Sequence, residues 1–288
     1  MLIEEQVLKN ASDFFKVSSE NIKVDHRLKG GMSNYTYLVY VLNEPYVIRI
    51  IGEKGEVLVN PKKEKDHLAL VKDLGITSET LFLDVDTGAK ISRYIDGEVL
   101  SGDITITDYM NVATTLKKLH QSKISGHDYE LKDRLRSYEK LLTNRVSQKY
   151  YLLKLKWLKM YDEMYEKNEK VFCHGDAQRS NLIRTKEGIQ LLDFEFSGMN
   201  DPYYDIASFG NISFEDSVRL LGYYLDKEPT FLELNKLKFY RMYQVLQWHI
   251  VATYKDEVGL SEKLHLDFKM IAEKYLNMAE QFYFEIME

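Results

Sequence analysis

Three polar residues near the middle of the chain follow short apolar stretches at a spacing that could serve phosphate chemistry. Asp176 comes just after residues 170–173, Asn181 lies five positions later, and Asp193 directly follows residues 189–192. Phosphoryl transfer needs an aligned nucleophile and cations on the phosphates, and therefore a carboxylate near the acceptor hydroxyl and oxygen ligands for Mg²⁺. A single acidic residue is usually a solvated surface group. The spacing of these three favours a shared catalytic role.

The elements expected around these residues form a sheet-rich first third and a helical remainder. Up to Gly97, apolar periodicity predicts helices and strands, with a tight turn at Asn43, Glu44 and Pro45. The helices are 3–15 and 61–74, and the strands are 22–28, 35–42, 46–51, 81–85 and 91–95. After Gly97 we expect helices over 107–120, 131–166, 204–225, 231–255 and 261–286, and strands over 170–173, 182–184 and 189–192. This order predicts an α+β protein of two lobes, residues 1–97 and 98–288, with a ligand cleft between them.

Composition limits the classes of function. The 288 residues are 44% hydrophobic and include one cysteine, Cys173, which excludes an internal disulfide framework and a Cys-rich zinc site. The 39 Lys and Arg residues are spread along a chain of net charge −6, so nucleic acid is not expected as a partner. The apolar runs are short and interrupted by charge, and we expect a soluble, cytoplasmic protein without membrane insertion. The negative charge weakly favours a cationic small substrate.

The motifs resemble those of a known superfamily. Residues 174–176 (His-Gly-Asp) with Asn181, followed by residues 193–195 (Asp-Phe-Glu), are similar to the catalytic and metal motifs of the aminoglycoside phosphotransferase and choline kinase superfamily. Residues 28–35 resemble the phosphate-covering loop of choline and ethanolamine kinases, and residues 200–207 resemble the segment after their metal-binding aspartate. The resemblance covers nearly the whole chain. It implies a bilobal protein-kinase-like fold, with a small antiparallel-sheet lobe that binds ATP and a larger, mostly helical lobe for catalysis and acceptor binding.

The resemblance assigns ATP to the first lobe and to the segment that joins the lobes. Glycines between two strands let backbone N–H groups approach phosphates, although a plain hairpin turn also explains them. Arg49 on the third strand would pair with phosphate and with Glu64, for which an exposed helix charge is the alternative. Adenine would bond to the main chain at the lobe junction. The nucleotide-binding residues so implied are Gly30, Gly31, Ser33, Asn34, Arg49, Glu64, Arg93, Tyr94 and Ile95.

In the second lobe the resemblance assigns roles around the reacting atoms. Asp176 would accept the proton of the acceptor hydroxyl, and Asn181 and Asp193 would coordinate Mg²⁺. Glu195 would support a second metal or face the cationic head of a substrate, and a salt bridge to lysine is its alternative.

Four further residues are expected to be structural. His174 would brace the catalytic loop by hydrogen bonding, and Asp205 resembles the acid that holds this loop's backbone in the superfamily. Cys173 is expected to be a buried thiol, because adjacent strand residues point to opposite faces and a Cys-His pair is geometrically poor. A lone histidine on an apolar helix, such as His120, is more often structural than catalytic.

Aromatic residues suggest how the acceptor would be held. The chain has 21 tyrosines, and aromatic faces bind quaternary ammonium ions well. Residues 244–255 resemble a late helix of choline kinases that carries tryptophans facing choline; Trp248 matches one of them, and Val251 stands where the second is expected. Tyr204 and Tyr254 are further candidates for acceptor contacts. Core packing is the alternative interpretation of Trp248.

These features predict phosphorylation of choline by ATP with Mg²⁺. Ile212 occupies a position where choline kinases usually carry an acid, and Glu215 is the nearest replacement. Ethanolamine or another small alcohol therefore stays open, and an aminoglycoside is disfavoured because it demands a dense acidic pocket. The remaining alternative is an inactive kinase fold that serves as a binding scaffold. The intact Asp176, Asn181 and Asp193 argue against it.

Overall fold

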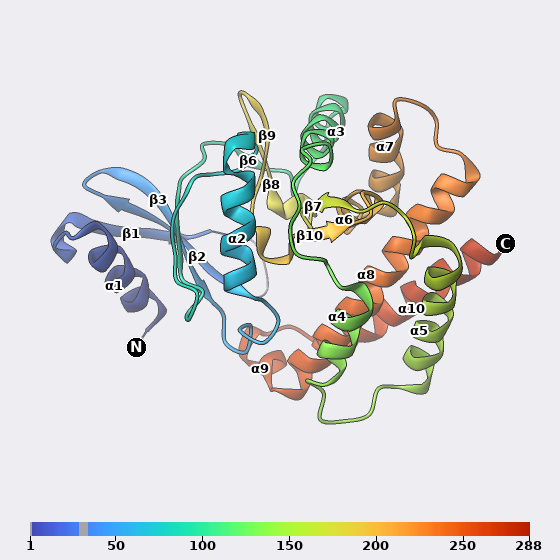
Figure 1. Cartoon of the computed structure of the whole chain (residues 1–288). Helices are drawn as coiled ribbons and strands as arrows, with labels where there is room; N and C mark the ends of the chain where they lie inside the picture. Colours follow the sequence, from blue (N-terminus) through green and yellow to red (C-terminus); the bar gives the residue numbers. More distant parts are fainter. Residues whose placement is uncertain (1, 29–33) are drawn as a thin grey trace.

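The computed structural model describes residues 2–28 and 34–288, and its two parts differ in secondary structure (Figure 1). The first part is a five-stranded antiparallel sheet of order β1-β2-β3-β5-β4. Its strands are β1 (Ile22–Arg27), β2 (Asn34–Val41), β3 (Glu44–Ile51), β4 (Thr80–Leu83) and β5 (Lys90–Arg93). Its helices are α1 (Ile3–Phe15), the 3₁₀ turn η1 (Ser19–Asn21), α2 (Pro61–Val71) and the 3₁₀ turn η2 (Lys72–Leu74).

A separate apolar core holds α1 against the sheet. Val7 and Ala11 of α1 are fully buried in a cluster with Val39, Ile48 and Ile91 from three strands. Full burial of such aliphatic side chains contributes roughly 1.5–3 kcal/mol each. On the other side of the sheet, α2 lies between the strands and the helical part (Figure 1), which places Glu64 of α2 close to both.

The second part is mostly helical and contains two small sheets. Its helices are α3 (Ile106–His120), α4 (Leu131–Glu139), α5 (Gln148–Met160), the π-helix η3 (Tyr161–Tyr165), α6 (Tyr203–Phe209), α7 (Phe214–Leu225), α8 (Phe231–Glu257), α9 (Leu260–Leu264) and α10 (Phe268–Met287). The strands are β6 (Glu98–Val99), β7 (Val171–Cys173), β8 (Leu182–Thr185), β9 (Gly188–Leu191) and β10 (Gly198–Asn200), in sheets β6-β8-β9 and β10-β7. The 3₁₀ turns η4 (Arg179–Asn181) and η5 (Phe194–Phe196) follow β7 and β9. The predicted bilobal arrangement is confirmed.

Three segments that periodicity predicted as single helices are divided in the structure, two of them at a helix cap. Residues 131–166, 204–225 and 261–286 each contain a break in the structure. The Ser147 hydroxyl accepts a hydrogen bond from the Tyr150 N–H and begins α5, and Asp267 does the same for α10. An apolar stripe continues across such a break, because both helices pack on the same core, and only the capping residue marks the new start.

The β2–β3 turn also differs from its prediction. Leu42 and Asn43 form the turn with φ of 51° and 70°, while Glu44 and Pro45 already belong to β3. A two-residue turn with both φ values positive matches the twist of the flanking strands. The sequence analysis therefore placed the turn one position too late.

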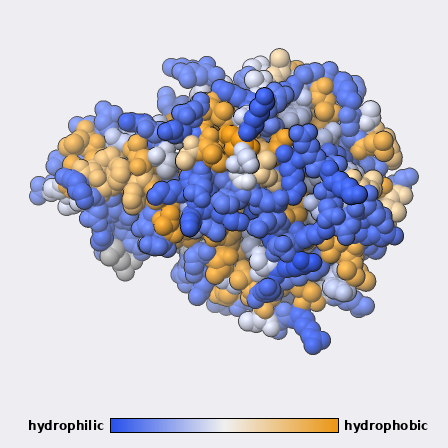
Figure 2. All heavy atoms as spheres, in the orientation of Figure 1, coloured by the Kyte–Doolittle hydropathy of each residue, from blue (hydrophilic) through white to orange (hydrophobic). Residues whose placement is uncertain are grey.

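The long helix α8 forms the centre of the helical part. Leu237, Met242, Val245, Leu246 and Ile250 are fully buried on successive turns, so the helix is surrounded by protein over much of its length. The face of the molecule seen in Figure 2 is largely hydrophilic, with its hydrophobic residues in separate patches. Among the described residues, no helix has the length and apolar character needed to span a bilayer.

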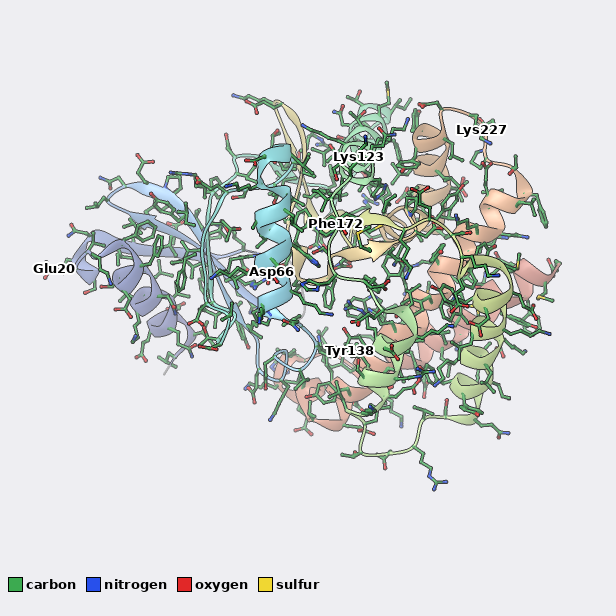
Figure 3. All side chains as sticks on the ribbon, viewed as in Figure 1. Glu20, Asp66, Lys123, Tyr138, Phe172 and Lys227 are labelled. Atoms are coloured by element: carbon green, nitrogen blue, oxygen red, sulfur yellow. The ribbon has the colours of Figure 1, made fainter. Side chains whose placement is uncertain are left out.

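His67 on α2 joins the two parts through a neutral ring. Its Nε2 accepts a hydrogen bond from the backbone N–H of His127 (3.0 Å), so Nδ1 carries the proton and donates to the Ser197 hydroxyl (2.8 Å). The ring packs edge-on against Phe172, whose side chain lies inside the molecule (Figure 3). Burial lowers the pKa of His67 from 6.5 to about 4.

This buried histidine predicts a loss of stability on acidification. The unfolded chain binds a proton at His67 near pH 6.5, whereas the folded chain resists it down to about pH 4, so the free energy of unfolding falls as the pH drops through this window. In urea titrations at several pH values, His67→Gln should flatten this slope. The matched control, His265→Gln at an exposed position, should keep the wild-type slope. Equal slopes in wild type and His67→Gln would contradict the assignment.

Candidate active site

A cavity of about 500 Å³ lies between the sheet-rich and the helical parts. Both parts line it. From the first part and the junction, the wall includes Asn34, Val47, Arg49, Lys90, Arg93, Tyr94, Ile95 and Ser101. From the helical part it includes Asp176, Gln178, Asn181, Ile183, Leu192, Asp193, Glu195, Phe196, Ser208, Asn211, Arg241, Trp248, Lys255 and Tyr275. The three residues on which the sequence prediction depends, Asp176, Asn181 and Asp193, therefore share one cavity.

Two neighbouring side chains fix the Asp176 carboxylate. The amide nitrogen of Asn181 donates to Asp176 Oδ2 and to its backbone carbonyl, both at 2.9 Å, and Gln178 Nε2 donates to Oδ2 at 3.0 Å. Burial raises the pKa of Asp176 to about 7, with a further contribution from the nearby Asp193. A carboxyl group with a pKa near neutrality is matched to general base catalysis, because it can accept a proton with useful driving force.

Asp205 holds the backbone that precedes Asp176. It is fully buried, and its two carboxylate oxygens accept hydrogen bonds from the N–H groups of His174 (2.7 Å) and Gly175 (2.8 Å). The Nε2 of His120 lies 3.0 Å from Asp205 Oδ2. Burial alone would raise the pKa of Asp205, but these hydrogen bonds keep it below its ordinary value. The bracing role predicted for Asp205 and the structural role predicted for His120 agree with these contacts.

His174 ties the Asp176 loop to the strand that leads to Asp193. Its Nδ1 accepts from the Asp176 N–H (3.2 Å), so its Nε2 carries the proton and donates to the Leu192 carbonyl (2.7 Å). Burial lowers the pKa of His174, which keeps the ring neutral. Gly175 follows with φ of +79°, and a Cβ there would overlap the Phe196 carbonyl. The predicted brace is confirmed, and the glycine is required by backbone geometry.

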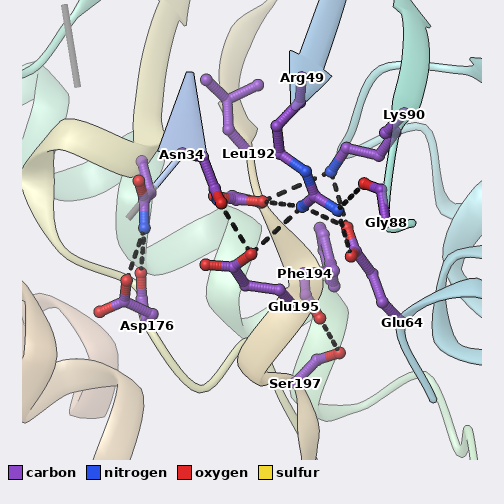
Figure 4. Close-up of polar contacts among 12 residues, drawn as sticks. Asn34, Arg49, Glu64, Gly88, Lys90, Asp176, Leu192, Phe194, Glu195 and Ser197 are labelled. Atoms are coloured by element: carbon purple, nitrogen blue, oxygen red, sulfur yellow. Dashed lines mark hydrogen bonds and ion pairs between the residues drawn. The ribbon is translucent and has the colours of Figure 1, made fainter. Parts of the chain in front are cut away.

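The Arg49 guanidinium is surrounded by carboxylates from both parts of the molecule (Figure 4). It forms a two-pronged pair with Glu64 of α2, at 2.7 and 2.9 Å. Its Nη1 also lies 2.7 Å from Asp193 and 3.3 Å from Glu195. Arg49 is 3% and Glu64 is 1% exposed, so the predicted Arg49–Glu64 pair is present and buried. Such paired, planar contacts orient both partners as well as hold them together.

Lys90 adds a second cation that the sequence analysis missed. It stands directly opposite Arg49 in the β3–β5 register. Its Nζ lies 2.7 Å from Glu64 and 3.4 Å from Asp193. The predicted fifth strand began at Ile91, one residue after Lys90, and so left out the cross-strand partner of Arg49. The register itself was the signal that could have revealed it.

Asp193 and Asn181 present oxygen atoms suited to a hard cation. Burial alone would raise the pKa of Asp193, but Lys90 and Arg49 hold it below its ordinary value, so the carboxylate stays ionised. Its backbone lies in the left-handed region (φ 64°, ψ 72°), which is uncommon for a residue other than glycine. Since Asp176 uses the amide nitrogen of Asn181, the amide oxygen is left for a ligand. A carboxylate and an amide oxygen are a donor set that Mg²⁺ accepts.

Glu195 lies beside this pair, and among the described residues Arg49 lies within salt-bridge distance of it. Its Oε2 accepts from Asn34 Nδ2 (3.0 Å) and faces Arg49 (Figure 4). The side chain is 5% exposed, and burial, with the nearby Asp193, raises the pKa of Glu195.

Comparison with known proteins agrees with this geometry. The family model described as choline/ethanolamine kinase matches residues 26–244. The chain belongs to the choline/ethanolamine kinase family. Protein LicA of Haemophilus influenzae is 25% identical over 269 residues, which cover 85% of this chain and 79% of that protein.

Two solved structures show that this family member shares their fold. Choline kinase LicA from Streptococcus pneumoniae matches with a TM-score of 0.80 at 23% identity, covering 98% of each chain. A structure of LicA in complex with AMP matches with a TM-score of 0.81 at 23% identity, covering 99% of this chain and all (100%) of that one. Family and fold together identify a small-molecule kinase that uses ATP and acts on an amino alcohol.

Most of the predicted ligand-binding residues of this kinase lie on the cavity wall. Asn34, Arg93, Tyr94, Ile95 and Trp248 line it, as do the residues discussed above. Glu64 lies behind Arg49 and acts through it. Gly30, Gly31 and Ser33 fall outside the described residues, so their predicted phosphate contacts stay predictions. Cys173 is fully buried, as predicted.

Two predicted acceptor contacts do not face the cavity. Tyr204 is 1% exposed in the core, where its hydroxyl lies 2.7 Å from the Tyr129 hydroxyl and its ring packs on Tyr243. Tyr254 is 6% exposed and also lies away from the wall. It follows Trp248 by six residues, about 240° around α8, so the two side chains cannot share a helix face. Neither tyrosine therefore lines the described cavity, contrary to the prediction that both contact the acceptor.

The departures from the choline kinase pattern also have structural explanations. Val251 is 3% exposed and packs in the core, so it leaves no gap in the cavity wall. Ile212 is 61% exposed, and Glu215 is exposed as well. Neither of them lines the cavity. Glu215 therefore does not replace the expected acid, and the carboxylates that line the cavity are those of Asp176, Asp193 and Glu195.

Arg49→Lys should weaken nucleotide binding, because an ammonium group cannot make the two-pronged contact with Glu64 while also reaching Asp193. We expect the Kd for ATP with Mg²⁺, measured by calorimetry, to rise about 10-fold, as for the loss of a charge-assisted hydrogen bond. Arg145→Lys, at an exposed loop position, is the matched control and should bind as wild type does. An unchanged Kd in Arg49→Lys would show that the arginine does not organise the phosphate end.

Proposed function

We propose that this kinase transfers the γ-phosphoryl group of ATP to the hydroxyl of choline. The observation that carries the proposal is the common cavity, whose wall includes the Asp176 carboxylate, the Arg49 network and aromatic side chains. Phosphoryl transfer depends on alignment and charge stabilisation rather than on covalent help from the protein. A wall that combines a carboxylate base, cations for the phosphates and aromatic side chains can hold the phosphoryl donor and the acceptor hydroxyl in line.

The nucleotide would occupy the end of the cavity formed by residues 1–97 and the lobe junction. Its adenine would lie between apolar wall residues such as Val47, Ile183 and Leu192, against the main chain near Tyr94 and Ile95. Its phosphates would lie beside Arg49 and Lys90. Mg²⁺ would be held by Asn181 and Asp193, with Glu195 nearby, and would neutralise charge on the phosphates.

Asp176 would orient the acceptor hydroxyl and take its proton. Its hydrogen bonds from Asn181 and Gln178 both reach Oδ2, so Oδ1 is the oxygen left to accept from the hydroxyl. The rise in the pKa of Asp176 makes this carboxylate a stronger base than an exposed aspartate. The Asp205 and His174 contacts keep it in place during the reaction.

The acceptor's cationic nitrogen would lie against aromatic faces. Trp248 is half-buried on the wall, with Phe196 edge-on to it at 6.0 Å between ring centroids, and Tyr275 lines the same end. Each aromatic face adds roughly 0.5–2 kcal/mol to the binding of a desolvated cation. Glu195 and Asp176 supply negative charge nearby. Among the described residues, one tryptophan lines this end. Ethanolamine has a smaller cationic group that needs fewer aromatic contacts, so it is the second candidate.

A coupled ADP assay with choline, ethanolamine, homoserine, methylthioribose, thiamine and kanamycin tests the function. Among the acceptors that lack a carboxylate, choline should stimulate ATP turnover most. Asp176→Asn should lower kcat by about 10²- to 10⁴-fold, because the base is lost. Trp248→Ala should raise the KM for choline by roughly 2- to 30-fold with little change in kcat, in line with the loss of one aromatic face.

Three results would contradict the proposal. Stimulation by kanamycin or methylthioribose without choline would move the acceptor to another class. An unchanged rate in Asp176→Asn would remove the assigned base. Preference for ethanolamine over choline would keep the chemistry and the amino-alcohol class but replace the acceptor.

A further inference from the structure

The acceptor end of the cavity contains a buried guanidinium that the proposed reaction does not use. Arg241 lies on α8, lines the cavity and is only 3% exposed. Trp248 and Lys255 follow it at intervals of seven residues, and both also line the cavity. A seven-residue interval is close to two helical turns, so the three side chains share one face of α8. This face presents cations as well as an aromatic ring to the acceptor.

Within the part of the chain that the structure describes, the Arg241 guanidinium has no carboxylate partner. One Nη donates to Gln244 Oε1 (3.0 Å), and Nε is buried with no hydrogen-bond partner. A guanidinium carries five N–H donors, and among the described residues Gln244 is the one side chain that accepts from this group. Two comparably buried arginines differ in this respect, because Arg49 pairs with Glu64 and Arg179 pairs with Asp216 at 2.8 Å.

An unpaired buried charge is costly to the folded state. Burial lowers the pKa of Arg241. Replacing water around a charge without supplying a counter-ion destabilises the folded state, so such a group usually has a partner. Gln244 is itself fixed by donating to the Tyr204 carbonyl (2.8 Å), which holds the guanidinium in place. A held, unpaired guanidinium on a cavity wall has the properties of an anion-binding site.

The anion would lie on the acceptor side of Asp176. Arg241 lies two helical turns from Trp248 on the same face of α8, and both side chains line the cavity. The phosphate end of the cavity has its own cations, Arg49 and Lys90, which contact Asp193. Arg241 is therefore placed near the acceptor rather than near the nucleotide.

We propose that Arg241 forms a carboxylate subsite beside the choline site, so that an amino alcohol that also carries a carboxylate is bound in preference to its uncarboxylated counterpart. The inference rests on the proposed alcohol kinase function and narrows its acceptor class. The cationic nitrogen of the acceptor lies against Trp248 and Glu195, while its carboxylate pairs with the Arg241 guanidinium. Choline supplies the first of these contacts and not the second.

Two pairs of alcohols that differ by one carboxylate test this inference. The pairs are ethanolamine with L-serine, and choline with N,N,N-trimethyl-L-serine. We compare kcat/KM in wild type, Arg241→Gln, Arg241→Lys and the exposed-site control Arg145→Gln. Wild type should prefer the carboxylated member of at least one pair, and Arg241→Gln should lower that preference by about 10- to 100-fold, as expected when a hydrogen-bonded charge partner is lost. Arg241→Lys should retain part of the preference, and Arg145→Gln all of it.

Several outcomes would overturn the inference, and they can be told apart from failure of the proposed function. Equal preference ratios in wild type and Arg241→Gln would overturn it while choline turnover stands. An equal loss for both members of a pair would assign Arg241 to the transferred phosphoryl group, and a raised KM for ATP alone would assign it to the nucleotide.

If no alcohol supports turnover, calorimetry with the same four alcohols, in the presence of ADP and Mg²⁺, decides the inference. Tighter binding of a carboxylated member that is lost in Arg241→Gln would support it, although the proposed function had failed. Equal affinities within each pair, or no binding by the carboxylated members, would overturn the inference about Arg241. Thermal melting of each variant confirms that a change in binding does not reflect unfolding.

Discussion

The buried Arg49 guanidinium is the interaction on which the active site depends. It lies on β3, pairs with Glu64 of α2, and reaches across the cavity to Asp193 and Glu195. Each of these groups would be costly to bury alone, whereas together they satisfy one another. The network joins the sheet-rich part to the helical part at the point where the phosphates are expected to bind. It therefore positions Asp193 and connects the two walls of the cavity.

A second network, behind the cavity, supports the catalytic loop. Asp205 accepts the N–H groups of His174 and Gly175, and His174 connects Asp176 to the Leu192 carbonyl. Asp176 and Asp193 come from different strand ends, and His174 fixes their separation through neutral hydrogen bonds. Two aspartates in one buried site repel each other, which contributes to the raised pKa of Asp176. The cations Arg49 and Lys90 contact Asp193 and do not contact Asp176, so the two carboxylates differ in basicity and can take different roles.

The sequence predicted the parts of this site that motifs encode and missed those that depend on tertiary geometry. The spacing of Asp176, Asn181 and Asp193, and the Arg49–Glu64 pair, followed from local pattern and resemblance. Lys90 needed the β3–β5 register, which a one-residue error in the strand boundary concealed. Tyr204 and Tyr254 had the right residue type, but core packing and helix rotation direct them away from the cavity.

Arg241 is a residue whose significance the sequence did not reveal. It stands seven residues before Trp248, a spacing visible in the sequence, but periodicity alone cannot separate a cavity-facing arginine from one that is paired inside a helix bundle. Its unpartnered Nε became apparent only with the surrounding side chains in place. A single capping residue, Ser147, likewise begins a new helix in the second part. Such a residue is difficult to recognise in a sequence whose apolar pattern continues across the break.

A crystal structure of the kinase with Mg²⁺ and a non-hydrolysable ATP analogue tests the central claim most directly. The account predicts a metal ion bound by the side-chain oxygens of Asn181 and Asp193 at about 2.1 Å, with the Arg49–Glu64 pair intact beside the phosphates. A metal held by other residues, or phosphates bound away from Arg49 with Asp193 turned out of the cavity, would contradict it.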